Sequence, residues 1–265
     1  MKNILVTGAY GGMGSATVKA LADGGYRVFA LDRRVGDAAE NVIPIEADIT
    51  SEQGVLKAFE TVREQAKSLY AIIHFAGIYM LDSLVEMSSE EFRRIFDVNL
   101  YGAFLVNKTF LPLLVSGSRI LITTSELAPL DPLPFTGIYA VTKGALDKYA
   151  YSLRMELQLL GISVSVLRAG AVDTGMLGAS TAALDRFCEK TELYTCNAAR
   201  FKEIVDRVEA RCISPSRLAS CAVGIVEKKT PRFTYAVNRN PLLRLLNLLP
   251  KRMQLFVIRL ILKKQ

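Results

Sequence analysis

Short apolar runs alternate with stretches of helical periodicity along most of this 265-residue chain. The runs are too apolar to have one exposed face, which is typical of parallel strands that helices cover on both sides. We expect strands at 3–7, 27–31, 42–46, 71–75, 119–123, 163–167 and 234–237, and helices near 12–23, 52–66, 89–115 (broken), 138–160 and 215–227. The sequence therefore predicts an α/β fold, a doubly wound parallel sheet of about seven strands with helices on both faces.

Two segments depart from this alternation. Residues from about 175 to 212 follow the sixth expected strand with little strand character, and an insertion at that point is placed to cover a ligand crevice. Residues from about 240 to 264 are basic and read as two short amphipathic helices separated by Pro250. With no linker or repeat evident, and 51% hydrophobic residues to fill a core, we predict a single domain over 1–265.

The net charge of +7 is concentrated in the basic tail. Ten basic residues and no acidic one follow position 227, so the residues before it sum to −3. No motif typical of nucleic-acid binding accompanies this charge, and we expect no nucleic-acid partner. Charges and Pro250 argue against a membrane span. Two roles for the tail stay open: a helix over the site's mouth or a neighbouring subunit, and attachment to an anionic bilayer.

Metal and thiol chemistry find little support. The four cysteines (Cys188, Cys196, Cys212 and Cys221) are widely spaced without a C-x-x-C pair, so we expect reduced thiols and no metal. His74 is the only histidine, and it lacks both a second metal ligand and a nucleophile elbow nearby, so we expect a packed residue. The chain enters its first strand without an apolar leader, and we expect a cytoplasmic protein.

A glycine-rich segment, Thr7–Gly14, joins the first expected strand to the first helix. Backbone N–H groups and the helix dipole at such a turn can bind a diphosphate, and glycine lets the ligand approach the backbone. Asp32 ends the second strand 18 residues later, where a carboxylate can accept hydrogen bonds from ribose hydroxyls and repels a 2′-phosphate. Arg33 and Arg34 could instead bind that phosphate. We predict a dinucleotide site that prefers NAD, with NADP possible.

Tyr139 and Lys143 are one helical turn apart at the start of the helix after the fifth strand. An ammonium beside a phenol favours phenolate, so we expect Lys143 to lower the pKa of Tyr139 and permit proton exchange near neutral pH. Thr124 and Ser125 end the preceding strand, and either hydroxyl could bind a substrate oxygen or merely cap a turn.

Together these motifs resemble the short-chain dehydrogenase/reductase (SDR) family over nearly the whole chain. Thr7–Gly14 is similar to its T-G-x-x-x-G-x-G, Ala76-Gly77 to the end of its N-N-A-G, and Asp97-Val98-Asn99 contains its helix asparagine. Ser125, Tyr139 and Lys143 match its serine and Y-x-x-x-K. The resemblance implies that Tyr139 is the acid/base, Lys143 binds the nicotinamide ribose, Ser125 orients the substrate oxygen and Asn99 supports a water relay.

The resemblance also completes the expected NAD(P) site. Its residues are Gly8, Gly12, Met13, Gly14, Asp32, Arg33, Asp48, Ile49, Ala76, Gly77, Tyr139, Lys143, Gly170, Val172 and Thr174. The chain departs from the family pattern at three places. His74-Phe75 replaces two asparagines, Arg168-Ala169-Gly170 lacks the proline of a P-G turn, and Ser125 precedes Tyr139 by 14 residues, one more than is usual.

The reaction that the resemblance implies is interconversion of a secondary alcohol and a ketone by hydride transfer, on CH-OH groups. The apolar tail and an apolar region at 127–135 favour a hydrophobic, hydroxysteroid-like substrate. We expect a dimer or tetramer. The alternative is a non-catalytic dinucleotide-binding sensor or scaffold on the same Rossmann fold, which should lack Tyr139 or Lys143.

Overall fold

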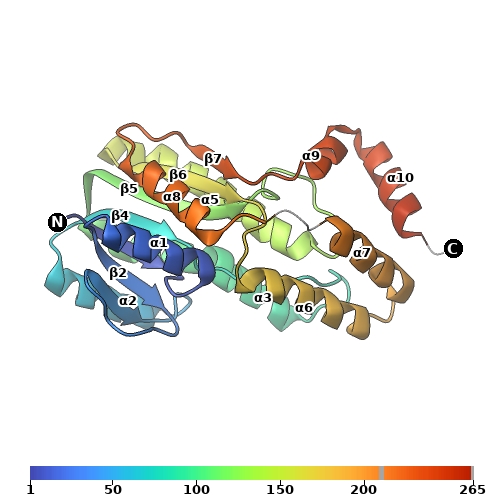
Figure 1. Ribbon diagram of the computed structural model, residues 1–265, viewed down its shortest axis with the longest axis horizontal. Coiled ribbons are helices and arrows are strands. Elements are labelled where there is room, and N and C mark those ends of the chain that lie inside the picture. The colour runs from blue at the N-terminus through green and yellow to red at the C-terminus, as the bar shows by residue number, and fades with distance from the viewer. Residues whose placement is uncertain (209–211, 264–265) are drawn as a thin grey trace.

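The computed structural model, which describes residues 1–208 and 212–263, is built around one parallel sheet with helices on both faces (Figure 1). The strands are β1 (Asn3–Thr7), β2 (Arg27–Asp32), β3 (Val42–Glu46), β4 (Leu69–His74), β5 (Leu114–Ser125), β6 (Ser163–Ala169) and β7 (Thr234–Val237). They lie in the order β3-β2-β1-β4-β5-β6-β7, and each neighbouring pair is parallel. The predicted doubly wound sheet is confirmed.

The helices that flank the sheet belong to two layers. They are α1 (Gly12–Asp23), α2 (Glu52–Gln65), α3 (Ser89–Phe96), α4 (Gly102–Phe110), α5 (Gly137–Leu157) and α8 (Pro215–Glu227). One buried cluster joins α2, α4 and α5 to one face, and a second joins α1 and α8 to the other. Both faces of the central strands are therefore covered, which explains why their sequences are continuously apolar.

The order in which the chain adds strands to the sheet reverses between β1 and β4. From β1 the chain adds β2 and β3 on one side, and it then returns to place β4 on the other side of β1. Thr7 and His74 are paired at the carboxyl ends of these two strands. In an open parallel sheet a crevice for ligands opens at this switch point, and the glycine-rich turn lies there.

The expected helix at 89–115 is broken in the middle and ends too early to match its predicted bounds. A π turn over Asp97–Tyr101 separates α3 from α4, and a 3-10 turn over Leu111–Leu113 follows α4. The predicted end at residue 115 is wrong because Pro112 removes a backbone donor, and Leu114 already pairs with Leu69 in the sheet. β5 consequently begins five residues before its predicted start.

The two irregular segments form a separate group of helices at one end of the molecule (Figure 1). The segment at 175–212 contains α6 (Gly175–Lys190) and α7 (Thr195–Val208), with 209–211 outside the described residues. The tail contains α9 (Pro241–Leu248) and α10 (Lys251–Leu262) on either side of Pro250, as predicted, and its residue 264 lies outside the described ones. Within 1–208 and 212–263, no helix is both long and apolar enough to cross a membrane.

Two phenylalanines of α4 allow a matched test of the core. Phe110 is fully buried between α2 and the sheet, whereas Phe104 is 40% exposed. Phe110→Ala should lower the free energy of unfolding by about 3–5 kcal/mol, because it leaves a cavity in a packed core. Phe104→Ala should lower it by less than about 1.5 kcal/mol. Urea unfolding of both variants measures the difference, and equal losses would contradict the described packing.

Candidate active site

A cavity of about 920 Å³ opens beyond the carboxyl ends of the central strands. Its wall combines the end of β5, the start of α5, the loop after β6, and parts of α6, α7, α9 and α10. Eight of the residues predicted from sequence line it: Met13, Gly77, Ser125, Tyr139, Lys143, Gly170, Val172 and Thr174. The remaining predicted residues lie between β1 and the first turn of α1, at the end of β2, in the segments after β2, β3 and β4, and in the π turn.

Ser125 and Tyr139 meet in this cavity. Both residues are buried and line the cavity, and the Ser125 hydroxyl is close enough to the phenol to act on its pKa. The hydroxyl of Thr124 instead donates to a carboxylate oxygen of Asp147 at 3.2 Å. Of the two hydroxyls that the sequence left open, Ser125 is therefore the one beside the phenol. The longer spacing between Ser125 and Tyr139 does not separate their side chains.

Lys143 lies on the same face of α5 as Tyr139, one turn further along. Its ammonium donates to the carbonyl oxygen of Thr123 at 3.4 Å and lies 5.8 Å from the centre of the Tyr139 ring. Burial lowers the pKa of Lys143 from 10.5 to about 8. The predicted juxtaposition of the two side chains is present.

The predicted lowering of the Tyr139 pKa is wrong for this structure. Burial raises that pKa and outweighs the opposite effect of the Ser125 hydroxyl, and the ring of Tyr79 packs against the Tyr139 ring with centroids 4.9 Å apart. The desolvation of the phenol therefore exceeds the effect of a lysine that is itself buried. Tyr139 consequently holds its proton throughout the neutral pH range.

Asn99 is fixed at the centre of the π turn. Its side-chain oxygen accepts from the Ile78 N–H at 2.8 Å, and its amide donates to the Ile78 carbonyl oxygen and to the Thr142 hydroxyl. A Cβ added to Gly77 would lie 3.2 Å from both the Asn99 oxygen and the Lys143 ammonium. The π turn thus brings Asn99, Gly77 and Lys143 together, as such turns often do at functional sites.

The tight packing of the glycine-rich turn and the uncapped start of α1 are both suited to a bound diphosphate. Gly8 has a φ of 66°, and an added Cβ would lie 2.5 Å from the backbone nitrogen of Ala76; at Gly14 it would lie 2.0 Å from the Gly8 carbonyl oxygen. At Gly12 it would meet Thr174 at 2.6 Å. No side chain caps α1, and its first turn carries no acid, so its N-terminal N–H groups stay available to an anion.

The predicted adenosine end of the site lies at the ends of β2 and β3. The Asp32 carboxylate accepts from the N–H groups of Tyr10 at 3.0 Å and Arg33 at 2.7 Å, which fixes it beside the glycine turn. Asp48 accepts from the N–H and hydroxyl of Thr50, and Ile49 is buried against Gly102. Hydrogen bonds from neighbouring residues thus fix the carboxylates of Asp32 and Asp48.

The loop after β6 is positioned by the strand next to it. Gly170 donates to the Val237 carbonyl oxygen at 2.9 Å, and an added Cβ would lie 1.8 Å from the Asn238 carbonyl oxygen, so glycine is required there. Arg168, two residues earlier, forms an ion pair with the Asp147 carboxylate at 2.6 Å. The missing proline is therefore compatible with a well-packed turn.

His74 is a packed residue, as predicted. It is 4% exposed, its Nε2 lies 2.9 Å from the Asn107 side-chain oxygen, and burial lowers its pKa to about 4. In the part of the chain that the structure describes, no cluster of His, Cys, Asp or Glu could hold a metal ion. His74, which replaces one of the family's two asparagines, is thus bonded to Asn107 of α4.

The sequence missed much of the cavity wall. Tyr79 packs on Tyr139, and Glu126 accepts from the Asn240 N–H at 2.6 Å while burial raises its pKa. Tyr79 could have been noticed because it follows Ala76-Gly77 closely. The larger omission is the apolar contribution of the two tail helices, through Leu242, Leu243, Leu246, Val257, Ile258, Ile261 and Leu262.

The tail helices are attached to the loop after β5. The backbone N–H of Asp131 donates to the Asn247 side-chain oxygen at 2.6 Å, and its carboxylate accepts from Gln254 at 3.0 Å and pairs with Lys251. At the far end, the Asn197 amide of α7 donates to the Leu262 carbonyl oxygen. The structure therefore agrees with the interpretation of the tail as a cover over the site.

A family model described as short chain dehydrogenase matches residues 2–185. The chain belongs to this family. Among curated relatives, estradiol 17-beta-dehydrogenase 2 of Mus musculus is 33% identical over 67% of the chain and 50% of that protein. The 3-ketodihydrosphingosine reductase of Bacteroides thetaiotaomicron is 25% identical over 97% of the chain and 96% of that protein. The chain thus spans half the length of the first relative and nearly all of the second.

Solved structures show the same fold. A short chain dehydrogenase family protein from Francisella tularensis superposes with a TM-score of 0.75 over 89% of this chain and 97% of its own, at 23% identity. The ligand-free aldohexose dehydrogenase of Thermoplasma acidophilum superposes with a TM-score of 0.72 over 91% of this chain and 95% of its own, at 22% identity. The family is one of oxidoreductases that act on CH-OH groups with NAD(P).

Because the Lys143 ammonium is buried, we expect this side chain to lower the free energy of unfolding. Lys143→Met should raise the free energy of unfolding at pH 7 by about 2–3 kcal/mol, since a charged group no longer has to be desolvated. Below pH 8 both states of the wild-type lysine are protonated, so the penalty is complete; it disappears as the pH rises from about 8 towards 10.5.

Urea unfolding at pH 7 and pH 10 measures this effect. The matched control is Lys148→Met, on the exposed side of the same helix, which should change little at either pH. A Lys143→Met variant that is less stable than the wild type at pH 7 would contradict the burial.

Proposed function

We propose that the protein is an NAD(P)-dependent oxidoreductase that interconverts a secondary alcohol and a ketone on a hydrophobic substrate. The observation that carries this proposal is the neighbouring pair of Ser125 and Tyr139 in a largely apolar cavity, beside the glycine turn. These two hydroxyls are suited to hold one substrate oxygen between them. When bound at the turn, a nicotinamide cofactor would supply or accept the hydride.

The protein's own contribution is to hold and move a proton. Because burial raises the pKa of Tyr139, its phenol is protonated at neutral pH and is ready to donate to a carbonyl oxygen. Ser125 would orient that oxygen by a second hydrogen bond. The Lys143 ammonium, with its pKa near 8, would place a positive charge close to the developing negative charge and would lose it in mildly alkaline solution.

The cavity wall supports a hydrophobic substrate. Apart from the Ser125 and Tyr139 region, it is formed largely by leucine, isoleucine, valine and phenylalanine side chains of α6, α7, α9 and α10. Apolar walls favour apolar ligands and leave the few polar groups to fix orientation. A hydroxysteroid-like substrate is our first candidate, in keeping with the relative named as an estradiol dehydrogenase.

A long-chain 3-keto substrate is the second candidate. The relative named as a 3-ketodihydrosphingosine reductase matches nearly the whole chain, including the tail whose helices line the cavity. The first relative matches only two thirds of the chain. Spectrophotometric assay of the purified protein with estradiol or estrone, a long-chain 3-keto base and simple alcohols, each with both cofactors, distinguishes these candidates.

Tyr139→Phe should reduce turnover by about 10²–10⁴-fold, because the proton donor is lost while the apolar ring remains. NAD(H) binding, followed by nicotinamide fluorescence, should persist. Tyr151→Phe, at a half-exposed position of the same helix, is the matched control and should leave turnover unchanged. Equal turnover in the Tyr139 variant and the wild type would refute the role of Tyr139. A wild type that binds the nucleotide but turns over none of these substrates would favour the alternative function, a non-catalytic sensor or scaffold.

Asp32 supports a preference for NAD over NADP. Its carboxylate is fixed beside the glycine turn, and the neighbouring Arg33 and Arg34 are exposed. Asp32→Ala should therefore raise the affinity for NADP relative to NAD by about tenfold or more, since the repelling and hydrogen-bonding group is lost. Titration with both nucleotides gives the ratio. Asp37→Ala is the control on the same loop, and an unchanged ratio for Asp32→Ala would assign the preference elsewhere.

A further inference from the structure

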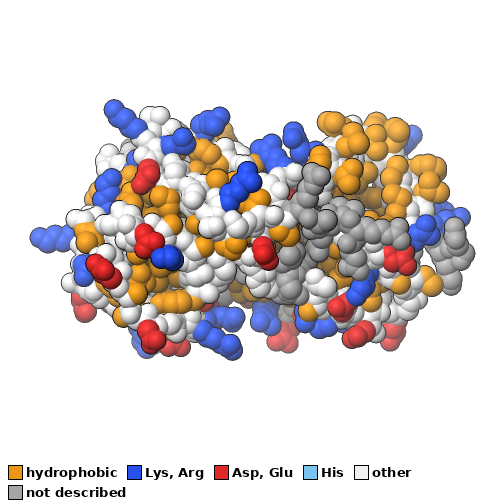
Figure 2. Space-filling view, in the orientation of Figure 1, with side chains coloured by type: hydrophobic (Ala, Val, Ile, Leu, Met, Phe, Trp, Pro, Cys, Tyr) orange, Lys and Arg blue, Asp and Glu red, His pale blue; other side chains and the backbone are white. Residues whose placement is uncertain are grey.

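The two tail helices have an outer surface that the cavity does not use. On α9, Leu245 and Leu248 are 62% and 80% exposed; on α10, Phe256 and Leu260 are 66% and 63% exposed. We call these four side chains, with Met253 and Leu255, the outer tail face. Isolated exposed apolar residues are ordinary, but a contiguous group is typical of an interaction surface. Figure 2 shows this hydrophobic surface over α9 and α10, with basic side chains at its border.

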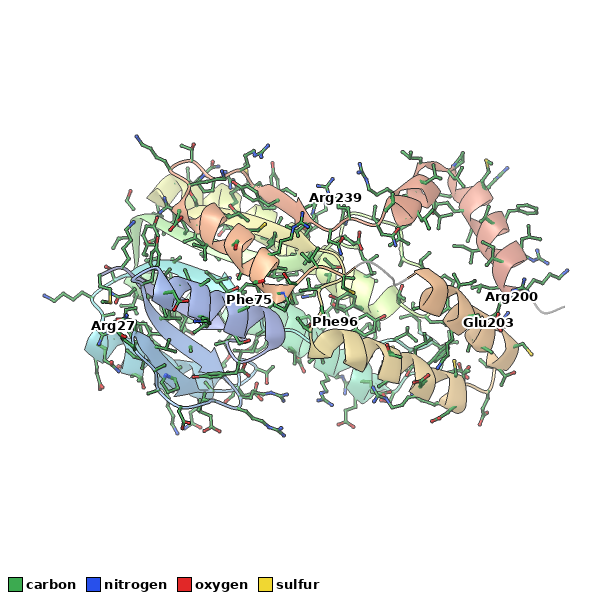
Figure 3. All side chains as sticks on the ribbon, in the orientation of Figure 1. Arg27, Phe75, Phe96, Arg200, Glu203 and Arg239 are labelled. Carbon is green, nitrogen blue, oxygen red and sulfur yellow. The ribbon has the colours of Figure 1, made fainter. Side chains whose placement is uncertain are left out.

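The charged side chains on the two tail helices are all basic. Arg244 of α9 and Arg252 and Arg259 of α10 are exposed, and no acidic residue follows position 227. On α10, Arg252 and Arg259 project on the same side of the helix as Phe256. Lys251 is different, because it is paired with Asp131. Arg239 continues the positive charge to the junction between β7 and α9, where Figure 3 labels it.

We propose that the outer tail face binds the surface of an anionic lipid bilayer. Leucine and phenylalanine side chains that alternate with arginines on short helices are typical of segments that lie in the membrane interface. α10 has 12 residues and spans about 18 Å, less than the hydrocarbon core, so these helices would lie on the bilayer and not cross it. The arginines would contact lipid phosphates while the apolar side chains enter the acyl boundary.

A second copy of the chain fits this face less well. A symmetric dimer through the outer tail face would bring the two sets of Arg244, Arg252 and Arg259 towards each other, with no acidic tail residue to pair with them. Glu203 is an acidic residue beside the end of α10 in Figure 3, but it belongs to α7 and lines a small second cavity together with Arg200. A bilayer supplies negative charge along the whole face. The inference does not depend on the proposed reaction, since it concerns only the outside of these helices.

Flotation of the full-length protein with vesicles tests the proposal. We expect binding to an equimolar mixture of phosphatidylcholine and phosphatidylserine, and at least tenfold weaker binding to phosphatidylcholine alone. Arg252→Gln with Arg259→Gln should weaken binding to the mixed vesicles by about 30-fold, because each basic residue near an anionic surface contributes about fivefold. Phe256→Gln with Leu260→Gln should weaken it by about tenfold or more.

Leu159→Gln with Leu160→Gln is the matched control. It removes two exposed leucines far along the chain from the tail, so binding should be unchanged. Circular dichroism establishes that every variant is folded. A wild type that does not float with mixed vesicles, or tail variants that bind as well as the wild type, would overturn the proposal. A second result would also overturn it: no lipid binding, together with a dimer in sedimentation experiments that the double variant Phe256→Gln and Leu260→Gln dissociates. The outer tail face would then bind a second copy of the chain.

Discussion

The architecture of the site depends on backbone segments that approach each other more closely than side chains would allow. Gly8 lies against the backbone of Ala76, Gly14 lies against the carbonyl of Gly8, and Gly170 lies against the carbonyl of Asn238. The contacts of Gly8 and Gly170 each join segments that follow different strands, and the contact of Gly14 closes the glycine turn after β1. These approaches bring the turns after β1, β4, β6 and β7 to one edge of the sheet, where Tyr139 of α5 also lies. The chemistry is therefore supported by tight packing at the strand ends and not by flexible loops.

Around this frame, the cavity combines polar groups whose pKa values are shifted by burial. Burial raises the pKa of Tyr139 and lowers that of Lys143. Desolvation acts in opposite directions on the pKa values of an acid and of a base. Around Tyr139 this burial comes from an apolar cluster that includes Tyr79, Ile95 and Leu127. Hydrophobic enclosure thus affects both the substrate that fits and the proton that is available.

Much of the sheet could be predicted because its strands are short, apolar and separated by clear turn signals. The end of the helix near 115 could not, because Leu114 pairs with Leu69, a long-range contact that local periodicity does not contain. The juxtaposition of Tyr139 with Lys143 followed from helical spacing, but the pKa of Tyr139 did not. That pKa depends on burial by Tyr79 and on distant helices, which no local pattern of residues specifies. The choice between Thr124 and Ser125 likewise required the position of Asp147.

The attachment of the tail through Asp131 means that the molecule is assembled from two pieces with different constraints. Residues 2–185 match the family model and contain the reactive side chains, whereas α9 and α10 line the substrate cavity from outside that region. Asp131, through its carboxylate and backbone amide, and Glu126, through its carboxylate, connect the pieces across the site. Evolution can therefore exchange the closing helices, and with them the size and lining of the cavity, while the catalytic half stays intact.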